Sequence, residues 1–249
     1  MKSSFLPALL AAAIVILVAL QGEAQSSSNE WQFAIAPYLW AAGMDGTMTI
    51  ADREADIDVP FSDIIDNLDL AFMGHFDMRN ERWMLASDLI FVDLEDSEEQ
   101  TNGTVTAGLK MTLLEAWGGY RISPAVTLLA GARWVDMSAS IRFIGDRGIV
   151  ENEADAGPSW IDPLIGIHVF APLSDRWWFG GHGDVGGFGV GSELTWQVYA
   201  DIGWKASDLI SIILGYRALD IDYEDGSGIP FVGVDVAMTG PQLGVAFIF

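Results

Sequence analysis

The chain has 249 residues, of which 35 are acidic and 12 basic, so its formal net charge is −23, and it has no cysteine. The charge excludes the basic surface on which nucleic-acid binding depends, and the absence of cysteine excludes disulfide bonds and thiol chemistry. Charged residues and glycines interrupt every apolar run after the first, and no linker divides the sequence. We therefore expect one domain and no transmembrane helix.

The first 24 residues have the features of an export signal. Lys2 precedes an apolar run over 5–20, and the small residues Gly22 and Ala24 follow it. This order of basic, apolar and small residues is that of a secretory signal peptide. Sixteen apolar residues are fewer than the roughly 20 that a spanning helix needs. We predict cleavage after Ala24 and a single mature domain over 25–249.

Segments of alternating apolar and polar residues then recur, separated by turn residues. Such alternation indicates a β-strand with one apolar and one polar face. Ten strands are predicted, an even number that places both ends of the domain on one side. Their ranges are 31–42, 68–79, 82–94, 104–120, 124–143, 158–171, 176–188, 193–204, 208–222 and 234–249.

The connections between these strands alternate between short and long. Short periplasmic turns and longer external loops are the arrangement of an outer-membrane barrel. Within the first long connection, 47–51 and 55–60 are expected to form an external hairpin. If they paired inside the membrane instead, the barrel would have eight or twelve strands and not ten. The long connections are 43–67, 95–103, 144–157, 189–192 and 223–233.

Alternation alone does not say which face is outside, but three observations favour lipid on the apolar face. Trp196 and Trp204 bracket nine residues of one strand, close to the length of a membrane strand with aromatic girdles at both interfaces. The last strand places Phe247 and Phe249 on its apolar face, and the export signal opens the chain. We therefore predict an all-β, antiparallel transmembrane β-barrel in a bacterial outer membrane, with these four aromatic residues in its girdles.

Two stretches, "PYLWAAGMDG" (37–46) and "GDVGGFGVGSELTWQ" (183–197), resemble motifs of a proteobacterial family of small outer-membrane β-barrel proteins. The resemblance covers essentially the whole mature chain. It implies a fold and a location among outer-membrane lipid and lipopolysaccharide rather than an activity. It also implies that Phe249 is recognised by the barrel assembly machinery. Pro37 and Pro241 each remove a ladder donor from the first and last strands, so we expect a seam that is locally open or bulged.

The polar faces of the predicted strands carry ionised groups of both signs, which we assign to the lumen. We expect a structural network there, because buried charges in a narrow barrel must pair. A metal site or a histidine-based pH gate is the alternative, although no zinc-binding spacing is present and we predict no metal. Lys110 and Glu115 stay unassigned, because 104–120 and 124–143 lose their phase after about ten residues. The predicted lumen residues are His75, Asp77, Arg79, Asp88, Arg133, Asp162, His168, His182, Asp184, Gln197, Asp201 and Arg217.

The long connections are strongly acidic, whereas basic residues gather at the short turns. Connection 43–67 alone holds seven acidic residues against Arg53. The acidic end is therefore expected to face outward, where its carboxylates could hold divalent cations shared with lipopolysaccharide.

These features give three functional hypotheses. The first is a structural or narrow-pore, porin-like barrel, cation-selective if it conducts. The second is a surface protein whose acidic loops bind divalent cations, lipopolysaccharide or a partner. The third is an outer-membrane hydrolase, but no catalytic constellation can be placed, so we expect neither enzymatic activity nor a cofactor.

Overall fold

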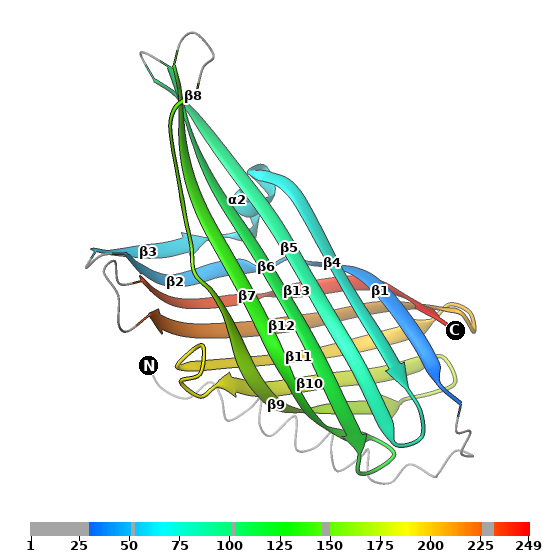
Figure 1. Ribbon diagram of the computed structural model, residues 1–249. Helices are drawn as coiled ribbons and strands as arrows, with labels where there is room; N and C mark the ends of the chain where they lie inside the picture. Colours follow the sequence, from blue (N-terminus) through cyan, green and yellow to red (C-terminus); the bar gives the residue numbers. More distant parts are fainter. Residues whose placement is uncertain (1–29, 51–52, 101–102, 146–149, 226–231) are drawn as a thin grey trace, which may run out of the picture.

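The computed structural model describes residues 30–50, 53–100, 103–145, 150–225 and 232–249. The predicted signal peptide, 1–24, lies outside the described residues. Within the described ranges the chain forms thirteen strands and one short helix (Figure 1). No helix in this part of the chain is long and apolar enough to cross a membrane.

Ten of the strands close into an antiparallel barrel, as the sequence predicts. Each pairs with the next in the ring, and the last pairs with the first. The predicted short turns all join neighbours in this ring. In order, the wall strands are β1 (Gln32–Trp40), β4 (Leu68–Arg79), β5 (Trp83–Gln100), β6 (Gly103–Arg121), β7 (Val126–Gly145), β9 (Ser159–Pro172), β10 (Trp177–Gly187), β11 (Leu194–Lys205), β12 (Ile210–Asp225) and β13 (Val232–Ile248).

The apolar faces of the wall strands point outward. In β11, Gln197 is 1% exposed while its neighbour Val198 is 48% exposed. The same alternation of exposed apolar and buried polar residues holds in the periplasmic half of β12, where Ser211 and Arg217 are buried while Ile212 and Tyr216 are exposed. In a soluble protein the exposed face would be polar, so this arrangement is the one that a lipid surround requires.

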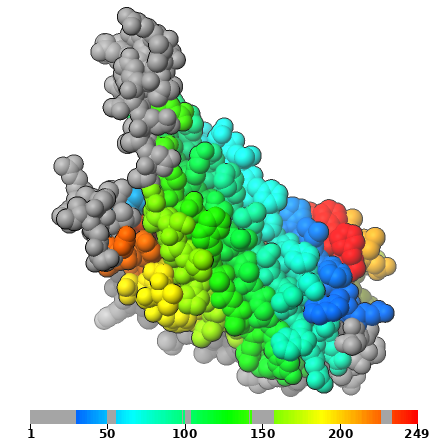
Figure 2. Space-filling view, viewed as in Figure 1, coloured from blue at the N-terminus to red at the C-terminus, as the bar shows by residue number. Residues whose placement is uncertain are grey.

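Several strands continue beyond the ring into predicted loops, so the loop predictions 95–103 and 144–157 are wrong over most of their described residues. The described ends of 223–233 belong to strands as well, and 226–231 lies outside the described residues. β5, β6 and β7 rise together above the barrel (Figure 1), and their side chains form a continuous surface on this flank (Figure 2). β8 (Val150–Ala156) pairs with β7 above the point where β9 leaves it. The β6–β7 register is unbroken throughout, so no bulge accounts for the lost phase of these two strands.

The first long connection forms the predicted hairpin, β2 (Gly43–Ile50) with β3 (Arg53–Val59). It lies outside the closed ring, yet β2 also pairs with β13, in the register that β1 begins. β1 and β2 are therefore one strand with a short interruption. The seam between β1 and β13 has no residue pair at Pro37, but its register does not shift there. The seam is therefore locally open and not bulged. Pro241 stays in the ladder between β13 and β12.

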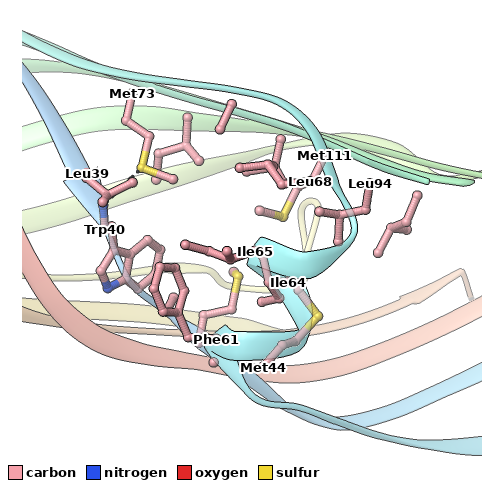
Figure 3. A pocket seen from close by; sticks show the side chains of 17 residues that line it. Leu39, Trp40, Met44, Phe61, Ile64, Ile65, Leu68, Met73, Leu94 and Met111 are labelled. Atoms are coloured by element: carbon pink, nitrogen blue, oxygen red, sulfur yellow. Dashed lines mark hydrogen bonds between the residues drawn. The ribbon is translucent and has the colours of Figure 1, made fainter. Parts of the chain in front are cut away.

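The barrel wall divides near its outer end. The ladder between β1 and β4 stops at the Pro37–Gly74 pair. Beyond it β2 and β3 follow β13, while β4 follows β5. The short helix α2 (Phe61–Asp66) connects β3 to β4 across this split (Figures 1 and 3).

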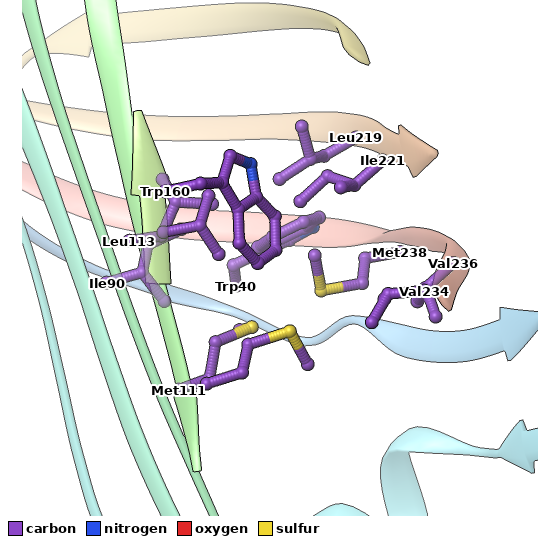
Figure 4. Packing of buried hydrophobic residues seen from close by; sticks show 12 residues of the cluster. Trp40, Ile90, Met111, Leu113, Trp160, Leu219, Ile221, Val234, Val236 and Met238 are labelled. Atoms are coloured by element: carbon purple, nitrogen blue, oxygen red, sulfur yellow. The ribbon is translucent and has the colours of Figure 1, made fainter. Parts of the chain in front are cut away.

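The interior of the barrel is polar in its middle and apolar toward its outer end, a division that the sequence interpretation missed. We call the apolar part the outer apolar cluster, and Figure 4 shows its side chains meeting across the lumen. Close packing of so many large side chains excludes water from this level of the barrel. Its members are Trp40, Ile90, Met111, Leu113, Val135, Met137, Trp160, Leu219, Ile221, Val234, Val236 and Met238.

Candidate functional site: a buried ion network across the lumen

A group of polar side chains below the outer apolar cluster links strands on opposite sides of the barrel. Every member occupies an inward position of its strand, which the period of two along each strand dictates. We call this group the lumen network. It consists of Tyr38, His75, Asp88, Glu115, Arg133, His182, Asp184, Thr195, Gln197 and Arg217.

Arg133 on β7 is one centre of the network and is fully buried. Its Nε donates to Glu115 Oε1 at 2.8 Å, and its Nη2 donates to Asp184 Oδ1 at 3.0 Å. Its Nη1 donates to Thr195 Oγ1 at 2.7 Å. One guanidinium thus joins β7 to β6, β10 and β11, using the fork of donors that a lysine lacks.

Arg217 on β12 is the second centre. Its Nε donates to Gln197 Oε1 at 2.7 Å, and its Nη1 donates to both Asp88 Oδ1 (3.0 Å) and the Tyr38 hydroxyl oxygen (2.9 Å). Its guanidinium carbon lies 4.9 Å from the centre of the Trp40 ring. The polar network and the apolar cluster therefore share a contact, which aligns the two levels.

Gln197 connects the two centres. It accepts from Arg217, and its Nε2 donates to Glu115 Oε2 and Asp184 Oδ2, both at 3.2 Å. An amide suits this place because it offers donors and acceptors at once. The network is therefore continuous across the lumen.

The charges of the network come close to balance. Two arginines face three carboxylates, of which Asp88 contacts His75 Nδ1 at 3.2 Å and Asp184 contacts His182 Nε2 at 2.8 Å. Protonation of one histidine would make the group neutral. His182 also stacks on Tyr199 with ring centres 4.8 Å apart, so its ring is held from two sides.

Asp162 belongs to a separate cluster. Its carboxylate accepts from the Trp160 indole at 3.0 Å and from the backbone and hydroxyl of Ser192 at 2.6 and 2.8 Å. Ser192 lies in the turn between β10 and β11. The cluster therefore fastens an external turn to the lumen wall.

The remaining predicted lumen residues lie at the periplasmic side of the network. Asp77 Oδ1 is 3.8 Å from Arg79 Nε, and Asp201 accepts from Gln242 at 2.6 Å. His168 is opposite His182 on the neighbouring strand. Its Nδ1 is buried without a partner among the described residues.

The predicted girdle residues all lie on the outward face. Trp204 ends β11 beside Trp177, with ring centres 6.4 Å apart. Trp196 lies further along the same strand toward the outer end. Phe247 and Phe249 are exposed at the periplasmic end of β13.

The sequence interpretation missed several participants. Glu115 was left unassigned although it lies inside the network, and Lys110 points outward, where its Nζ is 3.0 Å from Asp93 Oδ2. Tyr38 had a usable signal, because it shares its phase with the buried Trp40. Among the described residues, no group of three or more acidic or histidine side chains is arranged to hold a metal ion.

Comparison with known proteins bears on the fold. No protein-family model matches the chain, and no curated protein sequence matches it. The outer membrane protease OmpT from Escherichia coli has a similar structure, with a TM-score of 0.54 at 8% identity, covering 91% of this chain and 99% of that one. This protein is an outer-membrane β-barrel.

Two further barrels are similar at lower scores. The translocator domain of the autotransporter NalP from Neisseria meningitidis has a TM-score of 0.42 at 12% identity, with 97% of this chain and 95% of that one covered. Ail, the attachment invasion locus protein of Yersinia pestis, has a TM-score of 0.38 at 11% identity, with 89% and 100% covered. At these identities the likeness concerns the fold alone.

Proposed function

We propose that this outer-membrane barrel is a closed, non-conducting structure that carries its tall outer strands at the cell surface. The supporting observation is the filling of the lumen at two successive levels. In the lumen network, Glu115, Arg133, Gln197 and Arg217 are each no more than 2% exposed. Above them the outer apolar cluster offers an ion no replacement for its hydration shell. Of the structural and narrow-pore hypotheses, this favours the structural one.

Planar-bilayer conductance of the refolded mature chain, 25–249, tests the proposal between pH 5 and 8. We expect no discrete channels. The double variant Trp40→Ala with Leu113→Ala, which removes two large side chains from the outer apolar cluster, should admit some conductance. The matched control, Leu39→Ala with Leu114→Ala, alters outward neighbours of the same residues and should stay silent. Discrete channels from the folded wild-type barrel would overturn the proposal.

A second candidate is a surface-binding role for the acidic outer face, favoured by the arrangement of carboxylates on β12, β13, β2 and β3. Asp222 lies directly opposite Asp235, and Asp45 lies directly opposite Asp58. Like charges in opposed positions repel one another. Diffuse attraction of divalent cations, which lipopolysaccharide phosphates also attract, would relieve that repulsion.

Binding to vesicles that contain lipopolysaccharide, with and without Ca²⁺, tests the second candidate. We expect Ca²⁺ to increase binding, and the variant Asp222→Asn with Asp235→Asn to lose part of the increase. The control Asp208→Asn removes a negative charge at a periplasmic turn and should keep the full Ca²⁺-dependent increase in binding. Equal binding with and without Ca²⁺ would rule the candidate out.

A further inference from the structure

A small cavity lies where the wall divides between β3 and β4. Its volume is about 70 Å³, and its lining side chains, from β1, β2, α2, β4, β5, β6 and β13, are all apolar. Figure 3 shows Phe61 and Ile64 of α2 on one side of it, with Met73 and Met111 on the other. A lining without polar groups favours an apolar ligand, because any polar atom placed there would lose its hydrogen bonds.

The wall beside the cavity is not closed by a backbone ladder. Past the Pro37–Gly74 pair, the backbone N–H of Trp40 donates to Met73 Sδ at 3.2 Å instead of to a carbonyl group of β4. A methionine side chain changes rotamer readily and adapts to irregular shapes. The cavity can therefore widen without breaking a strand pairing.

The mouth of the cavity lies on the outward face. Leu39, Ile65 and Leu68 line it and are exposed, and the next outward residues of β4, Leu70 and Phe72, are exposed as well. The apolar lining is thus continuous with the lipid-facing surface of β4. This apolar continuity offers a hydrocarbon chain a route from the surrounding lipid into the cavity.

The polar rim of the mouth is acidic. A second, polar hollow adjoins the cavity at Leu68 and is lined by Asp66, Asp69 and Glu95. These carboxylates repel an anionic head group such as that of a fatty acid. An uncharged head group meets no such repulsion and finds acceptors for its hydrogen bonds.

We propose that this cavity binds an uncharged hydrocarbon chain, which enters sideways between β1 and β4 from the outer leaflet. The volume is roughly half of the ~150 Å³ that accommodates benzene in an engineered apolar cavity, so occupancy requires the methionines to move. The site lies at the edge of the outer apolar cluster, with which it shares Trp40, Ile90, Met111 and Met238. Conductance tests the closed lumen and ligand binding tests the site, so the two proposals can fail separately.

Methionine-methyl NMR of the full mature chain, held in lipid-free amphipol, tests the site. Of the eight methionines in the mature chain, 25–249, Met44, Met73, Met111 and Met238 line the cavity. Titration with 1-decanol should shift these four methyl signals and leave the others in place. Decanoate, which has the same chain length and a negative head group, should bind roughly tenfold more weakly or worse.

Two variants keep the test decisive. Ala71→Phe fills the cavity and should abolish the shifts. Ala42→Phe, in the link between β1 and β2 that also lines the cavity, serves the same purpose if the first variant does not fold. Ala200→Phe adds the same volume on the outward face of β11 and should leave the shifts intact. Uniform shifts of all methionines, shifts that survive the filling variants, or no shifts in the wild type would each overturn the proposal.

A lipid arm distinguishes the source of the chain. In phosphatidylcholine nanodiscs with a nitroxide on the acyl chain, broadening of the Met73 and Met111 methyl signals relative to Met137 identifies a lipid chain as occupant. If 1-decanol shifts the signals in amphipol but the labelled lipid does not broaden them, a free uncharged amphiphile is the occupant. Either result supports the site.

Discussion

Glu115 and Arg133 lie directly opposite each other on β6 and β7, and their 2.8 Å ion pair is almost completely buried. Such a pair gains little over apolar packing while both members are present, but removing one member leaves an uncompensated charge. Here the same guanidinium also holds Asp184 on β10. The pair is therefore part of a brace across the barrel, not a local contact between neighbouring strands.

Arg133→Met should destabilise the barrel by about 3–5 kcal/mol, because it strands two buried carboxylates. Denaturant unfolding of the refolded barrel in detergent measures the change. Arg79→Met is the control, since Arg79 is less buried and lies 3.8 Å from its carboxylate, and it should cost about 1 kcal/mol or less. Equal losses in the two variants would show that the network contributes no more than a weak ion pair does.

Tyr38→Phe removes one hydroxyl from the network. That hydroxyl donates to Asp88 at 2.6 Å and accepts from Arg217, so its loss should cost about 1–3 kcal/mol. Tyr216→Phe makes the same change on the outward face, where the side chain is exposed, and should be nearly neutral. A neutral Tyr38→Phe, measured by the same unfolding assay, would contradict the role given to this hydroxyl.

Gly203→Ala should destabilise the barrel by about 1–3 kcal/mol through overpacking. A Cβ at this inward position of β11 would collide with the indole ring of Trp178 on β10. Gly183→Ala, at an outward position of β10 where the nearest atom is 3.9 Å away, should be tolerated. Comparison of the two unfolding midpoints measures the difference, and equal midpoints would mean that the ring of Trp178 is free to move aside.

Stability should also respond to pH at the acidic outer end. Burial, followed by the charges of Asp235, Glu224 and Glu193, raises the pKa of Asp222. The folded protein therefore keeps the proton of Asp222 to a higher pH than the unfolded chain does. The contribution of this group to the free energy of unfolding is fully present below its pKa in the unfolded chain, and it is lost as the pH rises through its pKa in the folded protein.

Asp222→Asn should consequently stabilise the barrel at pH 7, by a few tenths of a kcal/mol because the site is well solvated. The gain should disappear below about pH 4, where carboxyl groups are protonated. Unfolding midpoints of the variant and the wild type across pH 3–7 measure this. A gain that is unchanged at low pH would rule out charge repulsion as its cause.

Much of the barrel could be predicted from the sequence because lipid enforces a pattern. Every outward position of a wall strand must be apolar, so 68–79 was predicted with the bounds that β4 has. Above the membrane that requirement ends. The run "EDSEEQ" (95–100) is polar on both faces and indicates a loop, yet it continues β5.

The lumen was harder to predict for two reasons. Along β6, Leu113 faces inward and Leu114 outward. The alternation of apolar and polar residues therefore disappears from the sequence where the lumen is itself apolar, and the sequence no longer indicates which way Glu115 faces. Partners across the lumen, such as Arg217 and Asp88, also depend on barrel closure and shear. No local pattern carries that information.

The continuity of β1 and β2 bears on how the barrel assembles. Every other pairing in the wall joins residues no more than 47 positions apart, the distance from Gln32 to Arg79. The seam joins residues between 182 and 214 positions apart, from Ile50 with Val232 to Ala34 with Ile248. Contacts of such long sequence separation form slowly, because the entropy cost of bringing distant parts of the chain together comes before the contacts stabilise it. We therefore expect the seam to be the last part of the wall to form, and the missing pairs at Ala36 and Pro37 to slow its closure.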